Sequence, residues 1–275
     1  MIEQLSTIFS YEFMRNALLA SMWISLACGI VGTLVVLNRI VSLSGGIAHA
    51  AYGGVGLAYY LGQDPMLGAL LFSTVSALVM GTAHRKSKTG ADTLIGVMWS
   101  IGMAVGIIFI SLTPGYKANL MSYLFGSILA VSSNDLKLMA LIAFVVLAFV
   151  ILSYRSLLAI SYDETFSTVR NVQVNLIYLS MLVLIGLTVV VSMRMVGLIL
   201  VIALLSIPPA VARVFLKDMR GIMLLSFILS AIFCALGLVI SFLTNIQTGP
   251  VIILLASTAY LISLLVRQLL TAKRQ

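Results

Sequence analysis

The sequence predicts an all-α protein, a polytopic bundle of about 8–10 transmembrane segments. Of its 275 residues, 61% are hydrophobic and 9% are charged, whereas about 25% of the residues of a soluble globular protein are charged. Apolar runs of roughly 20 residues, the length that crosses a bilayer, recur from one end to the other. We therefore expect a single transmembrane domain over residues 1–275.

Short breaks rich in Pro, Gly and charged residues separate the predicted spans. The first run is too long for the apolar region of a signal peptide, so we expect it to remain as a span. Residues 116–134 are too interrupted for a regular span and suggest a re-entrant or interfacial segment. The predicted spans are 13–37, 45–62, 66–83, 93–113, 135–154, 173–193, 195–216, 221–243 and 249–269.

Lysine and arginine predict the orientation. With the loop 84–92 in the cytoplasm, twelve of the 16 basic residues fall inside and four outside, as the positive-inside rule requires. This places the C-terminus and the long loop 155–172 in the cytoplasm. The net charge of +8 does not indicate nucleic acid, because the basic residues lie between spans.

Several chemistries have no motif in this chain. All eight acidic residues map to span ends or loops, whereas ion-coupled carriers usually hold ionisable groups within the bilayer. No GxxxxGK[ST] phosphate loop, GxSxG or HExxH motif occurs. Cys28 and Cys234 suit apolar packing. We expect a non-enzymatic transport protein that binds no cofactor itself and whose energy comes from another subunit.

His49 is the one ionisable side chain expected near the bilayer midplane. Residues 40–62 would form a helix of about 34 Å, with His49 about 15 Å from Arg39. Ser44-Gly45-Gly46 suggests a helix break just before it. Two interpretations compete: His49 donates to a backbone carbonyl that the break frees, or its neutral imidazole is a transient ligand for a transition metal.

The glycines around His49 suggest two different faces. Gly53 and Gly56 follow it by four and seven residues, so they share its face and leave open space there. Gly46, Ala50, Gly54 and Ala58 form a ridge at a spacing of four, which favours close helix packing.

The loop 155–172 is the one long cytoplasmic connection. Asp163 and Glu164 suit the first turn of a short helix running toward Arg170. Such a helix is either a docking element for a soluble partner or an ordinary connector.

Several segments together resemble one family, the membrane permeases of the ABC importers for zinc, manganese and iron (the ZnuB type). They keep the order and spacing of that family over nearly the whole chain. The segments are GGIAHAAYGGVGLA at 45–58, DTLIGVMWSIGMAVGI at 92–107, YLFGSILAVSSNDL at 123–136, MVGLILVIALLSIPPAVAR at 195–213 and TGPVIILLA at 248–256.

The resemblance implies a homodimeric permease of the bacterial cytoplasmic membrane. Two cytoplasmic ATP-binding subunits would hydrolyse ATP, and an extracytoplasmic metal-binding protein would deliver the metal ion. His49 falls on the histidine of the DxxxH motif of the family. Asp163 to Asn171 fall on a coupling segment similar to DPExAxxxG, which contacts the ATPase. Pro208 and Pro209 match a proline-containing helix of the pathway.

Two departures from the family pattern matter. Gly45 stands where the family has the aspartate of DxxxH, and Ser167 and Asn171 replace alanine and glycine in the coupling segment. Asn171 is a mild change because asparagine tolerates the left-handed conformation.

Without the carboxylate, the donors near His49 are Ser42, Ser44 and Tyr52, a neutral set that suits zinc or iron(II) better than manganese. Met98 and Met103 suit core packing or a soft pathway lining.

Three rival functions remain at this stage. The first is a permease of the same architecture for a chelated or organic substrate. The second is a self-contained channel or secondary carrier, with sodium sites built from backbone carbonyls. The third is a structural subunit of a membrane complex. A stable ATPase partner would separate the first from the other two.

Overall fold

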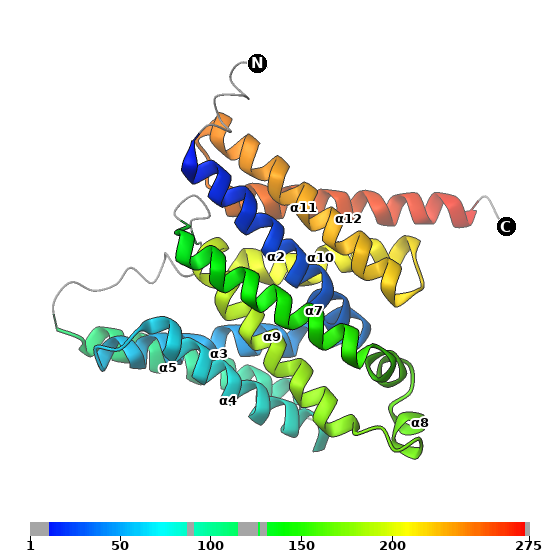
Figure 1. Cartoon of the computed structure of the whole chain (residues 1–275), viewed down its shortest axis with the longest axis horizontal. Helices are drawn as coiled ribbons and strands as arrows, with labels where there is room; N and C mark the ends of the chain where they lie inside the picture. Colours follow the sequence, from blue (N-terminus) through cyan, green and yellow to red (C-terminus); the bar gives the residue numbers. More distant parts are fainter. Residues whose placement is uncertain (1–10, 87–90, 115–125, 127–130, 273–275) are drawn as a thin grey trace. The chain divides into compact units, whose positions relative to one another are not determined.

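The computed structural model of the protein describes residues 11–86, 91–114, 126 and 131–272, so most of the predicted segment 116–134 lies outside the described residues. The described residues are helical and contain no strand. The helices are α2 (Glu12–Leu37), α3 (Val41–Tyr60), α4 (Pro65–Lys86), α5 (Ala91–Leu112), α7 (Ser133–Tyr162), α8 (Glu164–Val169), α9 (Val174–Val196), α10 (Leu198–Phe215), α11 (Met219–Thr244) and α12 (Thr248–Ala272) (Figure 1).

Each of the nine predicted spans corresponds to one long helix. Eight of the described helices are long and apolar enough to cross a membrane, and α3 is not among them, since its glycines, serines, tyrosines and His49 lower its mean hydropathy. One boundary differs clearly from the prediction. Helix α7 continues to Tyr162, so the first half of the expected loop 155–172 is helical.

Local side-chain bonds define several helix ends. The Asp64 carboxylate accepts a hydrogen bond from the Met66 N–H at 2.8 Å at the start of α4. Asp218 caps α11 by accepting from the Gly221 N–H at 2.6 Å. Helix α11 ends at Asn245, whose φ of 55° is left-handed. These caps satisfy backbone groups that a helix end leaves without partners.

The chain forms two compact units, each assembled from separate stretches of sequence. One comprises residues 1–36, 122–147 and 192–275, and the other comprises residues 37–121 and 148–191. The first holds α2, α10, α11 and α12, and the second holds α3, α4, α5 and α8.

In the first unit, α2 packs against α10 and α11 through glycines. A Cβ on Gly29 would lie 2.7 Å from the backbone nitrogen of Phe227, and one on Gly32 would lie 2.4 Å from the carbonyl oxygen of Leu205. Real Cβ atoms essentially never come so close, so the helix backbones touch directly at these positions. Small residues permit such contact between membrane helices.

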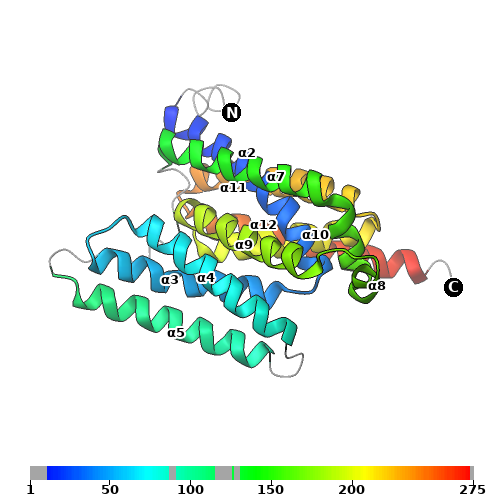
Figure 2. The ribbon, with the colours of Figure 1, turned by 60° about the horizontal axis from the view of Figure 1, so that its bottom comes forward.

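In the second unit, α3 lies between α4 and α5 (Figure 2). A Cβ on Gly54 of α3 would lie 2.1 Å from the carbonyl oxygen of Gly68 in α4. A Cβ on Gly102 of α5 would lie 2.5 Å from the Cα atom of Ala50. The expected packing ridge along Gly46, Ala50, Gly54 and Ala58 is therefore present. Because α3 is mostly buried between its neighbours, it does not need a lipid-compatible surface.

Candidate functional site

His49 lies near the middle of α3, and the packing of α3 on α5 determines what surrounds it. Gly46 of α3 meets Ile95, Ala50 meets Gly102, and Gly56 meets Gly106. In these contacts the residue numbers increase together along both helices, so α3 and α5 run parallel. The parallel register places Trp99 of α5 beside His49.

The imidazole of His49 stacks on the indole of Trp99. The ring centroids are 3.9 Å apart and the ring planes are inclined by 13°. His49 is half-buried, and the Trp99 side chain is 38% exposed. One face of the imidazole is thus covered by an aromatic surface, which fixes the plane of the ring.

The described residues provide no hydrogen-bond partner for the buried Nδ1 atom of His49. A metal-ligating histidine usually donates its second N–H to a carboxylate or carbonyl group, which fixes the tautomer and orientation of the ring. At His49, the stack on Trp99 holds the ring orientation instead.

The helix break predicted at Ser44-Gly45-Gly46 is wrong. Helix α3 is continuous through these residues. The Ser44 N–H donates to the Ile40 carbonyl at 3.0 Å, and the Ser44 hydroxyl donates to the Val41 carbonyl at 2.8 Å. Gly46 serves close packing, since a Cβ there would lie 2.6 Å from Ile95. No carbonyl is freed for His49, so that interpretation of the histidine also fails.

Open space occurs next to Gly45, one helical turn before His49. A Cβ on Gly45 would meet no heavy atom of the described residues within 4 Å, although the residue itself is buried. The space expected beside Gly53 and Gly56 is absent, because Cβ atoms there would meet Phe72 at 2.9 Å and Gly106 at 2.3 Å. Close contact with α4 and α5 is the role of these two glycines.

The other donor candidates on α3 differ in accessibility. Tyr52 is fully buried and Ser42 is exposed, while the Ser44 hydroxyl is already bonded to Val41. Met98 and Met103 of α5 are both half-buried. Within the part of the chain that the structure describes, no group of three or more His, Cys, Asp or Glu side chains could hold a metal ion. Among these candidates on α3 and α5, the imidazole of His49 is thus the one strong donor.

The predicted cytoplasmic helix is present as α8. The Asp163 carboxylate caps it by accepting from the Phe166 N–H at 2.9 Å. The buried Ser167 hydroxyl donates to the Asp163 carbonyl at 2.8 Å. Asn171 follows α8 with a φ of 57°, which confirms that asparagine supplies the conformation usually given by glycine. Phe166 and Val169 leave an exposed apolar surface on this helix.

Pro208 and Pro209 both lie within α10 and are buried. Proline has no backbone N–H, so Pro209 cannot donate the usual helical hydrogen bond to the carbonyl of Leu205, four residues earlier. That carbonyl oxygen faces Gly32 of α2, where only a residue without Cβ fits. The two prolines therefore lie one turn after a point at which α10 touches α2, within the same unit.

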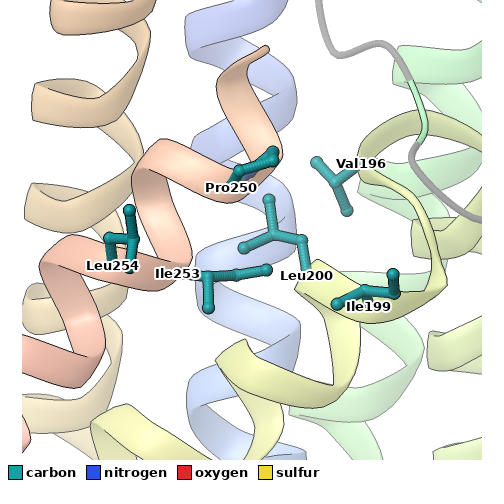
Figure 3. Close-up of a pocket in the computed structure, with 7 residues that line it drawn as sticks. Val196, Ile199, Leu200, Pro250, Ile253 and Leu254 are labelled. Atoms are coloured by element: carbon teal, nitrogen blue, oxygen red, sulfur yellow. The ribbon is translucent and has the colours of Figure 1, made fainter. Parts of the chain in front are cut away.

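One cavity has a wholly apolar lining. It lies beside the start of α12 and α10, and Figure 3 shows Leu200 and Ile253 between these helices. Its volume is about 300 Å³, and its side chains offer no ligand for an ion. The lining residues are Val196, Ile199, Leu200, Gly249, Pro250, Ile253 and Leu254.

Sequence reasoning missed two features. Trp99 lies within the quoted segment 92–107, but only the parallel pairing of α3 and α5 brings it to His49. A polar cluster at the end of α4 was also missed: Arg85 pairs with Glu164, and the Tyr178 hydroxyl and the His84 Nδ1 atom are 3.1 Å apart. These residues are distant in sequence, so no local pattern indicates their contact.

The long apolar helices define a polytopic α-helical membrane protein, and comparison with known proteins identifies its family. The sequence profile of the ABC 3 transport family matches residues 10–267. The chain is 50% identical to an uncharacterized membrane protein of Synechocystis sp., over 98% of this chain and 95% of that protein. It is 30% identical to the manganese transport system membrane protein MntC of Listeria monocytogenes, over 95% of this chain and 93% of that protein.

A solved structure shows the same fold. The structure of PsaBC from Streptococcus pneumoniae in complex with Fab matches with a TM-score of 0.85 and 30% identity, covering 96% of this chain and 95% of that one. The chain belongs to the ABC 3 transport family, and the fold is that of an ABC permease. The resemblance drawn from the sequence segments is confirmed.

We predict that Trp99→Leu lowers metal uptake by cells about two- to tenfold, the range that corresponds to the energy of one aromatic pair. Trp99→Phe keeps a ring over His49 and should retain most of the uptake. The control is Trp23→Leu, which changes the other tryptophan, in α2. Wild-type uptake by Trp99→Leu at equal expression would show that the stack has no role.

Proposed function

We propose that this chain is the membrane-spanning subunit of an ATP-driven importer for a divalent transition metal, with zinc as the first candidate and manganese or iron(II) as alternatives. A dimer of the chain forms the pathway, and cytoplasmic ATP-binding subunits dock on α8 and hydrolyse ATP. An extracytoplasmic metal-binding protein supplies the ion. The chain lies in the bacterial cytoplasmic membrane with its C-terminus inside.

The observation that carries this proposal is the isolated imidazole of His49 on α3, one turn from the open space at Gly45. Neutral imidazole is a good ligand for zinc and other transition metals. One protein ligand holds an ion weakly, and weak binding suits a pathway that must release its substrate. The relative named for manganese transport and the PsaBC match support a metal as the substrate class.

The choice of zinc rests on the donors that the described residues offer near His49. Manganese prefers oxygen ligands, above all carboxylates, whereas zinc readily takes nitrogen ligands. Gly45 supplies no carboxylate, and the Ser44 hydroxyl is engaged with a backbone carbonyl. The open space at Gly45 also favours a second candidate, a chelated or bulkier substrate carried by the same architecture.

Whole-cell elemental analysis under metal limitation tests the proposal. We expect the content of one metal to fall in a deletion strain and to fall similarly in His49→Ala, because the imidazole is the donor on the pathway. The amount of protein in the membrane should be unchanged. If no metal changes in the deletion strain while the ATPase partner is expressed in the parent strain, the substrate is not a metal ion.

Gly45→Asp is expected to change metal preference. The space at Gly45 admits the side chain, and the carboxylate would lie one helical turn before His49. We expect a lower KM for manganese relative to zinc in uptake assays, because a charged oxygen ligand joins the imidazole. Gly45→Asn is the matched control, since it has the same shape without the charge. Equal metal preference in the two variants would place the substrate away from His49.

A further inference from the structure

A cluster of polar side chains ties the short helix α8 to the end of α4. The Arg85 guanidinium, in the last turn of α4, donates through Nη2 to the Glu164 carboxylate in the first turn of α8. The Arg85 side chain is 24% exposed and that of Glu164 is 56% exposed.

Two further contacts restrict the Arg85 guanidinium. It lies over the ring of Tyr178 in α9, with its carbon 5.5 Å from the ring centroid. The Tyr178 hydroxyl in turn lies 3.1 Å from the Nδ1 atom of His84, the neighbour of Arg85. An exposed ion pair contributes little because its side chains are mobile. The Arg85 guanidinium is partly buried and supported by the Tyr178 ring, so its geometry is better defined than that of an exposed ion pair.

The cluster faces a cavity of about 460 Å³ beneath α8. Asn38, just before α3, donates through Nδ2 to the Ser161 hydroxyl at 3.1 Å near the end of α7. Thr165 and Thr168 of α8 line the cavity together with Asn38 and Arg85. The large apolar side chains of α8, Phe166 and Val169, are exposed, and the described contact between α8 and α4 is the ion pair of Glu164 with Arg85.

Arg85 lies on α4 and His49 on α3, and these two helices pack directly on each other. Helix α4 touches α3 backbone to backbone, because a Cβ on Gly68 would lie 2.3 Å from the Gly54 carbonyl oxygen. Helices in such contact cannot slide past each other without separating. A displacement of α8 that pulls on Arg85 would therefore move α4 and α3 together, and with them the imidazole of His49.

We propose that Arg85 is a positioning residue that couples α8 to the α3–α4 pair through its ion pair with Glu164, so that movement of the ATPase reaches His49. This inference rests on the proposed function. It assigns a role to Arg85, which lies outside both the coupling segment and the candidate substrate site, through its contact with Glu164 of the coupling segment. Arg85 acts through Glu164 and α4 and does not touch the substrate.

The test uses the complete complex of permease and ATPase in proteoliposomes and measures zinc uptake and ATP hydrolysis on the same preparation. We expect Arg85→Glu and Glu164→Gln each to lower the number of ions imported per ATP by about fivefold or more, the lower range of allosteric couplings. Basal ATP hydrolysis and copurification of the ATPase should stay near wild type in Arg85→Glu, because Arg85 lies in α4, outside the coupling segment. The double variant with Arg85→Glu and Glu164→Arg should restore the ratio.

Arg155→Glu is the control, since it reverses an exposed cation near the end of α7. A wild-type import ratio in Glu164→Gln, or failure of the charge swap to restore it, would overturn the inference alone. Absence of uptake of zinc, manganese and iron(II) alike by the wild-type complex would overturn the proposed function and the inference with it.

Discussion

Direct backbone contact between α3 and its two neighbours is the constraint on which the candidate site at His49 depends. At Gly54 and Gly68, and at Ala50 and Gly102, there is no room for larger side chains. Close approach of this kind lets van der Waals contact hold membrane helices together where lipid offers no hydrophobic driving force. It also sets the parallel register of α3 and α5, and that register alone brings Trp99 to His49.

The same packing explains why α3 is less apolar than the other long helices. Large apolar side chains of its two neighbours are exposed, as Leu71 of α4 and Ile101 of α5 are with exposed fractions of 71% and 55%. Helix α3 is covered within its unit and can carry an imidazole, serines and glycines. Polar groups within a membrane protein are costly, and they persist where they serve a function.

Composition and local patterns predicted much of the fold. Apolar length located nine helices, and Asp163 and Glu164 predicted the short helix α8 running toward Arg170, since capping side chains act within a few positions. Glycine was harder to interpret because it serves both as a helix breaker and as a contact point. Gly46 is a contact point and Gly45 borders open space, and neither interrupts α3, so the predicted break was wrong. Trp99 and Arg85 escaped prediction because their partners lie on other helices.

The proposed function requires that this chain conduct a metal ion only when an ATPase drives it. The most direct test is uptake of radioactive zinc into proteoliposomes that contain the purified chain, with and without its ATP-binding subunit. We expect uptake that requires both the subunit and hydrolysable ATP. Uptake by the chain alone at the same rate would identify a self-contained channel or carrier and contradict the proposed function.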